Sequence, residues 1–152
     1  MRIAFDLDDL LIPSQFSFPT SSLSIWQKAL RLENLREGTC HLFSELKKQD
    51  HEIWVYTSSL RTRSHIFKTF LFQGMVLDGI VNYQKHQTSV PVEFKNLSKH
   101  PPSFGIHLMI DDRPVIQLDG QQFDFEVLCI SPHELLWTHK VLETTAQLMK
   151  LH

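Results

Sequence analysis

Short apolar runs alternate with longer, partly polar segments along this chain. None of the runs shows the strict apolar–polar alternation of a strand with one wet face, so we expect strands that are buried on both faces. Four runs are predicted to be strands: RIAFD at 2–6, IWVY at 53–56, IHLMI at 106–110 and EVLCI at 126–130. A further short apolar piece lies at 76–81.

Helical patterns fill most of the segments between these runs. In residues 36–49, Cys40, Phe43 and Leu46 follow one another at three-residue spacing before a charged end. Further helices are expected at three places: 62–73, a small helix at 94–98, and 133–151. Buried strands separated by helices predict an α/β fold, namely a doubly wound, Rossmann-like three-layer sandwich with a central, mostly parallel sheet.

One segment does not follow this alternation. Residues 12–27 mix Pro, Ser, Thr and aromatic residues, which indicates an irregular flap, and we place the whole flap at roughly 10–35. The chain has 152 residues, the length of one ordinary domain. We therefore predict a single domain over 1–152.

Charge and composition argue against several classes of function. Lys and Arg number 15 and Asp and Glu number 17, so the net charge is −2, and nucleic acid is not an expected partner. No apolar run is long enough to span a bilayer, and Arg2 and the early aspartates leave no room for the apolar part of a signal peptide. The chain has two cysteines, Cys40 and Cys129, which are too few and too far apart to suggest a disulfide framework or a zinc site. We therefore predict a reduced, cytoplasmic protein.

The candidate chemistry lies where the predicted strands end. The first strand ends in Asp6, with Asp8 two residues later, the second ends before Thr57, and the third is followed by Asp111 and Asp112. In a doubly wound sheet ligands bind beyond the carboxyl ends of the strands, so these side chains are expected to meet at one edge. Each motif alone is ordinary, since Asp is common in turns and at helix N-termini. Their conjunction at three strand ends indicates one site.

Four carboxylates at one edge of a sheet need a cation. Two carboxylates about 4 Å apart repel each other by roughly 4 kcal/mol at an effective dielectric constant of about 20. Oxygen ligands suit Mg²⁺, which typically binds one or two carboxylates and keeps positions for water and phosphate. The sequence therefore predicts a Mg²⁺ site that also accepts a phosphate group.

With these motifs in this order, the chain resembles the haloacid dehalogenase-like (HAD-like) hydrolase superfamily, whose members are mostly Mg²⁺-dependent phosphatases. IAFDLDDLL matches the first motif of that family, IWVYTSS the second, a lysine ahead of the last motif the third, and LMIDD the fourth. The resemblance covers roughly residues 2–132. It implies a phosphoric monoester hydrolase, because a dehalogenase proper lacks the second aspartate of the first motif.

The resemblance also implies a role for each matching residue. Asp6 would attack phosphorus and form an aspartyl-phosphate, while Asp8 would protonate the leaving oxygen and then activate water. Thr57 and Ser58 would bind phosphoryl oxygens. The implied metal ligands are Asp6, the main-chain carbonyl of Asp8, and Asp112. Asp111 would either bind the metal directly or contact the residues that do.

Two lysines compete for the third motif, whose lysine would neutralise charge on the nucleophile and the phosphoryl group. Lys95 is preferred, because it opens a stretch, KNLSKHPP, that is similar to the KDLS-type segment of small phosphatases acting on the RNA polymerase C-terminal domain. Lys99 lies four residues later and shares the same face if a helix continues. Pro101 and Pro102 would keep such a helix short.

One position departs from the family pattern. Leu10 stands where relatives commonly have Thr or Val, so this loop is expected to pack differently. The alternative to an active phosphatase is therefore a catalytically weak or inactive HAD-like domain that acts as a binding or regulatory module.

The resemblance further implies an open site. The segments from Asp9 to Thr57 and from Thr57 to Lys95 are used up by the flap and by core elements, which leaves no room for a large cap domain. Uncapped members suit large phosphorylated substrates, such as phosphoproteins, or use an oligomer neighbour as a lid. The flap aromatics Phe16, Phe18 and Trp26 either contact the substrate or pack under their own loop. The cations Arg61, Arg63 and Lys68 either meet a second phosphate near the site or belong to a solvated helix face.

Two other families share parts of this pattern. A response-regulator receiver also combines an acidic pair, Thr and Lys, but its acidic pair comes first, whereas here DxD opens the set and DD closes it. A polynucleotide-end phosphatase is disfavoured by the near-neutral charge.

Overall fold

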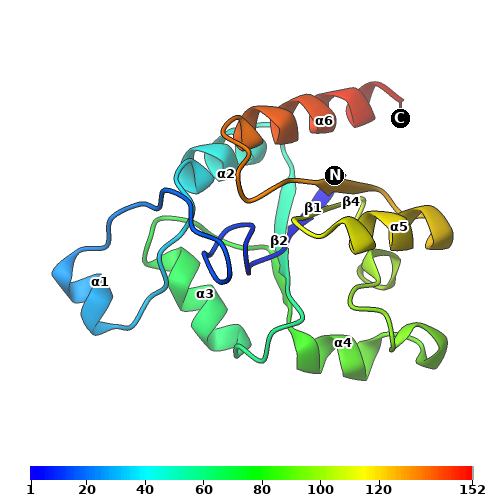
Figure 1. The fold of residues 1–152 in the computed structure, drawn as a ribbon, viewed down its shortest axis with the longest axis horizontal. Coiled ribbons are helices and arrows are strands. Elements are labelled where there is room, and N and C mark those ends of the chain that lie inside the picture. Colours follow the sequence, from blue (N-terminus) through cyan, green and yellow to red (C-terminus); the bar gives the residue numbers. More distant parts are fainter. Residues whose placement is uncertain (152) are drawn as a thin grey trace.

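Five parallel strands form one sheet in the computed structural model, which describes residues 1–151 (Figure 1). Each of the predicted apolar runs overlaps one of them, and their order across the sheet is β3-β2-β1-β4-β5. Every neighbouring pair is parallel, so the predicted α/β class is confirmed and the described sheet is wholly rather than mostly parallel. The strands are β1 (Arg2–Phe5), β2 (Glu52–Tyr56), β3 (Gly79–Val81), β4 (Leu108–Asp111) and β5 (Val127–Cys129).

Helices follow the strands and cover both faces of the sheet. The predicted helices at 36–49, 62–73 and 133–151 are confirmed with shorter bounds, as α2, α3 and α6. Within residues 1–151 the α-helices are α1 (Ile25–Ala29), α2 (Thr39–Lys48), α3 (Arg63–Leu71), α4 (Tyr83–Ser89), α5 (Pro114–Phe123) and α6 (Trp137–Leu151).

The side chains of the central strand divide between two apolar clusters. Ile3 and Phe5 belong to the larger cluster, which α2, α3 and α6 cover, whereas Ala4 belongs to a smaller cluster on the other face. Ile116 of α5 joins that second cluster, and His86 of α4 reaches the same face. This arrangement is the predicted three-layer sandwich.

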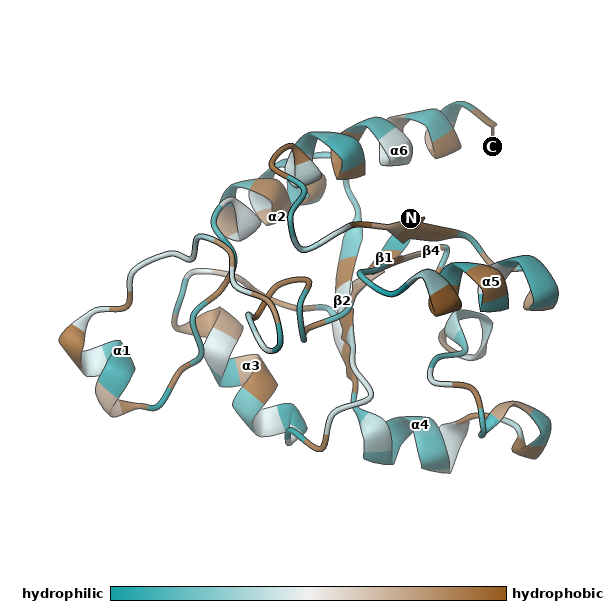
Figure 2. Cartoon of the chain, viewed as in Figure 1, coloured by the Kyte–Doolittle hydropathy of each residue, from teal (hydrophilic) through white to brown (hydrophobic). Residues whose placement is uncertain are grey.

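Four helical details differ from the predictions. The sequence did not indicate α1, α4 or α5. The small helix expected at 94–98 is absent from the described chain, where a 3-10 turn (Val92–Phe94) ends at the first residue of that stretch. Figure 2 shows why α4 was missed, because its ribbon is almost wholly polar. In α5, a proline at the first position and a glycine inside the helix weaken the apolar pattern.

The order of the strands fixes where a ligand would bind. The chain proceeds outward from β1 through β2 to β3 and then returns to the other side of β1 with β4, so β1 and β4 border the point where the strand order reverses. Ligands of such sheets bind outside the carboxyl ends of the strands at that point.

No large cap domain is inserted between the described elements. Among residues 1–151, no helix combines the length and the apolar character needed to cross a membrane.

Candidate active site

Asp6 stands at the carboxyl end of β1, where the strand order reverses. Its main-chain N–H donates to the carbonyl of Ile110 in β4 at 2.9 Å, which fixes the residue against the neighbouring strand. The carboxyl group is almost fully buried, and this burial raises its pKa above the usual range, with Lys99 opposing the shift. A carboxyl group in such a place needs a cation to stay ionised.

Lys99 supplies that positive charge. Its Nζ forms an ion pair with Oδ1 of Asp6 at 2.8 Å and donates a hydrogen bond to Oδ2 of Asp111, and its side chain is fully buried. The structure thus corrects the preference for Lys95. Lys95 borders a separate small cavity, where its main-chain carbonyl accepts from the side chain of Gln87.

The local chain geometry explains this correction. The helix expected to carry Lys95 and Lys99 on one face does not form, and His100 has extended backbone (φ −137°), as is typical of a residue that precedes proline. The main-chain N–H of His100 donates to the hydroxyl of Tyr56 at 2.8 Å. This contact ties the segment of Lys99 to the end of β2.

A buried polar network supports that contact. The Tyr56 hydroxyl lies 2.5 Å from Nδ1 of His86, and Nε2 of His86 faces the carbonyl of Lys95 at 3.4 Å. A carbonyl only accepts, so the proton of a neutral His86 belongs on Nε2, and Nδ1 accepts from the tyrosine hydroxyl. Burial lowers the pKa of His86, which favours this neutral form.

The acidic pair after β4 divides into two environments. Asp111 is fully buried and fully engaged, because one oxygen accepts from Lys99 and the other from the main-chain N–H of Arg113 at 3.0 Å. Oδ1 of Asp112 is buried without a hydrogen-bond partner. Burial, followed by the charges of Asp111 and Asp6, raises the pKa of Asp112 to about 7.

These three carboxyl groups form a compact oxygen cluster. One oxygen from each of Asp6, Asp111 and Asp112 lies within 4.8 Å of the others. The unpartnered oxygen of Asp112 and the raised pKa values of Asp6 and Asp112 both indicate uncompensated negative charge. An all-oxygen donor set with a surplus of negative charge fits a hard divalent cation.

The carboxylate of Asp8 does not belong to this oxygen cluster and is bound by Arg61 instead. Its two oxygens accept from Arg61 Nη1 at 3.0 Å and Nη2 at 2.8 Å, and Arg61 also donates to Glu33 of the flap. Burial disfavours the charged guanidinium, but the hydrogen bonds with Asp8 and Glu33 outweigh it and raise the pKa of Arg61. Arg61 therefore has partners within the protein and does not form a solvated helix face, whereas its contact with a second phosphate stays a prediction.

Thr57 and Ser58 lie at the carboxyl end of β2, as predicted. The main-chain N–H of Thr57 donates to the carbonyl of Val81 at 2.9 Å, which continues the ladder between β2 and β3. Thr57 is buried, and its hydroxyl bonds to Ser59, whereas the Ser58 hydroxyl is exposed and lies 3.0 Å from that of Ser98. Both residues line the same cavity as Asp6.

Asp9 has a structural role that the sequence analysis did not assign. It adopts a left-handed conformation (φ 61°), and its buried carboxylate accepts from the main-chain N–H groups of Ser14 (2.9 Å), Gln15 (3.3 Å) and Phe16 (3.0 Å). Asp9 therefore fixes the start of the flap above the site. The signal was the residue type itself, since aspartates at turns commonly bind nearby backbone N–H groups.

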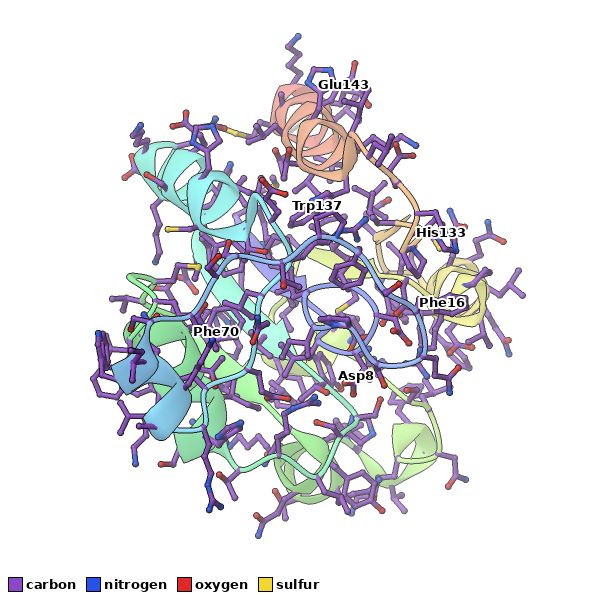
Figure 3. The ribbon with its side chains drawn as sticks, turned by 60° about the vertical axis from the view of Figure 1, so that its left-hand side comes forward. Asp8, Phe16, Phe70, His133, Trp137 and Glu143 are labelled. Atoms are coloured by element: carbon purple, nitrogen blue, oxygen red, sulfur yellow. The ribbon has the colours of Figure 1, made fainter. Side chains whose placement is uncertain are left out.

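A cavity of about 590 Å³ joins these parts. Figure 3 shows Asp8 and Phe16 on the same side of the molecule, with His133 beside Phe16. The lining residues come from the first-motif loop, the flap, the end of β2 and the loops after β4 and β5: Asp6, Asp8, Asp9, Ser14, Gln15, Phe16, Thr57, Ser58, Ser59, Asp112, Arg113, Pro114 and Pro132.

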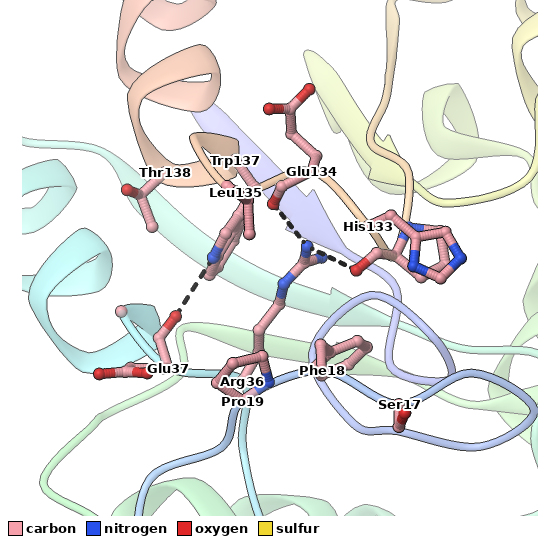
Figure 4. A pocket seen from close by; sticks show the side chains of 12 residues that line it. Ser17, Phe18, Pro19, Arg36, Glu37, His133, Glu134, Leu135, Trp137 and Thr138 are labelled. Carbon is pink, nitrogen blue, oxygen red and sulfur yellow. Dashed lines mark hydrogen bonds between the residues drawn. The ribbon is translucent and has the colours of Figure 1, made fainter.

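A second cavity, of about 370 Å³, surrounds Arg36 (Figure 4). The guanidinium group of Arg36 lies between the rings of Phe18 and Trp137, at 4.6 and 5.0 Å from their centroids. It donates to main-chain carbonyls on both sides, including those of Leu10 at 3.2 Å and Glu134 at 2.9 Å. This arrangement joins the flap to the loop after β5 and contains no acidic cluster.

Comparison with known proteins supports the fold assignment. No family model and no curated protein sequence matches this chain. Among solved structures it is similar to one described as a predicted HAD-like family hydrolase from Porphyromonas gingivalis, with a TM-score of 0.51 and 16% identity over 97% of each chain. At this identity the similarity concerns the fold, and the chain accordingly has a HAD-like α/β fold.

Proposed function

We propose that this protein is a Mg²⁺-dependent phosphatase that hydrolyses a phosphomonoester through an aspartyl-phosphate on Asp6. The observation that carries the proposal is the set of groups around Asp6. A buried lysine binds one of its oxygens, and two further carboxylates lie within metal-binding distance of it. The HAD-like fold supports hydrolase chemistry at this position.

Asp6 is well placed to act as a nucleophile. Lys99 binds Oδ1, which holds the carboxyl group in one orientation and leaves Oδ2 for attack on phosphorus. The same lysine would neutralise charge on the phosphoryl group as it is transferred. Thr57 and Ser58, at the end of the adjacent strand, would donate hydrogen bonds to the remaining phosphoryl oxygens.

The donor set fits Mg²⁺. Asp112 would be a direct ligand, because its buried oxygen has no other partner, and Asp6 and the main-chain carbonyl of Asp8 would complete the protein ligands. Asp111 would orient Lys99 instead, since both of its oxygens are already engaged. When bound, Mg²⁺ supplies electrostatic stabilisation for the charge on the transferring phosphoryl group.

Asp8 would serve as the acid and base of the two steps. It lines the cavity with Asp6, and Arg61 fixes its carboxylate through two hydrogen bonds. Protonation of the leaving oxygen requires that Asp8 gives up part of this contact. The Arg61 contact is therefore the observation that favours the alternative function, a slow or inactive domain that binds phosphorylated ligands.

The open cavity also bears on the partner. Since no large cap domain covers the edge of the sheet, the site would admit a phosphate group on a large molecule, such as a phosphoprotein, as well as a small ester.

The test is hydrolysis of p-nitrophenyl phosphate with Mg²⁺, with EDTA, and by the Asp6→Asn variant. We expect Mg²⁺-dependent release of nitrophenol that falls at least about a thousandfold in the variant, because the covalent step needs the carboxylate. Asp119→Asn, on α5 outside the cavity, is the matched control and should keep the activity. Wild-type protein should also bind beryllium fluoride, a mimic of the phosphorylated aspartate. Absence of both turnover and beryllium fluoride binding would refute the phosphatase and leave the binding module.

A further inference from the structure

The three aromatic residues of the flap have different surroundings. The ring of Trp26 meets that of Phe72 edge to face at 6.0 Å, and Phe18 packs on the guanidinium group of Arg36. Phe16 alone of the three lines the cavity that contains Asp6. Trp26 and Phe18 thus have structural partners, and Phe16 is the flap aromatic that faces the candidate site.

Phe16 is held rigidly although it is not part of the core. Its main-chain N–H is bound by the buried Asp9, and its ring meets the ring of His133 edge to face at 5.6 Å. The residue is nevertheless 45% exposed. An aromatic ring that is fixed in place while much of its surface stays open offers a preorganised contact for an apolar group.

The cavity has room and an apolar wall for such a group. Its volume of about 590 Å³ lies in the range of cavities that bind whole small molecules, well above the need of a phosphate group alone. Pro114 and Pro132 contribute further apolar surface to the lining.

The charged residues argue against a second anionic group as the occupant of this space. Among the described residues that line the cavity, Arg113 is the one cation, and it already contacts Asp111 and Ser98. Arg61 is engaged by Asp8 and Glu33. A second phosphate or carboxylate would have to displace one of these contacts, whereas an apolar ring would not.

We infer that Phe16 binds the leaving group, and that the substrates are phosphomonoesters whose alcohol carries an aromatic group close to the ester oxygen. This inference rests on the proposed function, because it takes the phosphate to lie at Asp6. The ring of the substrate then packs against Phe16, with Asp9 fixing the flap in the position that makes the contact.

The first test compares two alkyl phosphates with leaving groups of similar acidity, 2-phenylethyl phosphate and ethyl phosphate. Phe16→Ala should lower kcat/KM for the aromatic ester about three- to tenfold more than for ethyl phosphate, the range expected for one aromatic contact. Trp26→Ala, in the same flap but facing Phe72, should change the ratio by less than about twofold. An equal effect of Phe16→Ala on both esters would overturn the inference and leave the phosphatase in place.

A binding measurement separates this inference from the proposed function. Benzylphosphonate and methylphosphonate cannot be hydrolysed, and their dissociation constants with Mg²⁺ present are measured by calorimetry. Wild-type protein should bind benzylphosphonate several-fold more tightly, and Phe16→Ala should abolish the difference while its circular dichroism spectrum stays unchanged. Equal binding of the two by wild-type protein would refute the role of Phe16. A preference for benzylphosphonate, with neither turnover nor binding of beryllium fluoride, would support the contact with Phe16 and refute the phosphatase.

Discussion

The cavity around Asp6 and the cavity around Arg36 both contain buried charge, and they compensate it differently. Around Asp6, Lys99 contacts two of the three carboxyl groups, Arg113 contacts one of those two, and Oδ1 of Asp112 has no partner. Around Arg36, a single guanidinium group donates to four main-chain carbonyls and lies between two aromatic rings. The first cavity is under-compensated within the protein and the second is satisfied.

This difference indicates a ligand-binding role for the cavity around Asp6 and a structural role for the cavity around Arg36. A buried polar atom without a partner costs free energy, and in a cavity that already gathers negative charge a bound cation can supply that partner. The satisfied hydrogen bonds of Arg36 need no ligand, and they join segments that are far apart in the sequence. We therefore expect substitutions in the first cavity to change activity, and substitutions in the second to change stability.

Lys99→Met is expected to cause a large loss of activity. This variant removes the cation that contacts Asp6 and should lower kcat for p-nitrophenyl phosphate by about a hundred- to a thousandfold. Lys95→Met is the matched control, because Lys95 lies outside the cavity, and it should change kcat by less than about threefold. Similar losses in the two variants would show that contact with Asp6 is not what the lysine contributes.

Arg36→Met and Asp112→Asn should differ in their effects on stability and on activity. Arg36→Met leaves several carbonyls without a donor and should lower the free energy of unfolding by about 3 kcal/mol, with kcat of the folded protein kept within about threefold. Asp112→Asn removes one charge from beside Asp6 and Asp111 and should abolish Mg²⁺-dependent activity.

Urea denaturation without metal, together with the assay, measures both effects. Asp112→Asn should not lower the free energy of unfolding, because it relieves repulsion within the cluster. A loss of stability in Asp112→Asn as large as that in Arg36→Met would remove the distinction between the two cavities.

The parts of the site that follow a strand were predictable from the sequence, because a strand end has a defined place. Asp6, Thr57 and Asp112 each come directly after, or one residue beyond, a buried apolar run. The parallel sheet then brings them to one edge whatever the intervening segments do. The alternation of buried strands with helices predicted the α/β class, and the lengths of the segments between the motifs predicted the absence of a large cap.

Residues on irregular segments could not be placed in this way. Lys99 lies on a stretch without regular structure, and its position depends on Pro101 and on the hydroxyl of Tyr56, which is distant in the sequence. The contact between Arg61 and Asp8 likewise joins segments 53 residues apart. Such contacts result from the packing of several elements, which no local pattern encodes.

The smallest effect concerns the hydrogen bonds of Tyr56 and His86, which support the segment that carries Lys99. Like the groups around Arg36, these side chains have their hydrogen-bond partners, but His86 can take up a proton. Burial lowers the pKa of His86, so the unfolded chain takes up a proton near pH 6.5 that the folded protein does not. The free energy of unfolding should therefore fall as the pH drops below about 6.5. For this one residue the slope is at most about 1.4 kcal/mol per pH unit.

The His86→Gln variant isolates this contribution from those of the other titrating groups. Between pH 7 and pH 5 its free energy of unfolding, measured in urea, should fall less steeply than that of the wild-type protein, because the glutamine does not titrate. His41→Gln, on the exposed side of α2, should keep the wild-type slope. Identical slopes for wild type and His86→Gln would mean that His86 takes up its proton in the folded state. The Tyr56 hydroxyl could not then donate to Nδ1, and the support for Lys99 would have to come from elsewhere.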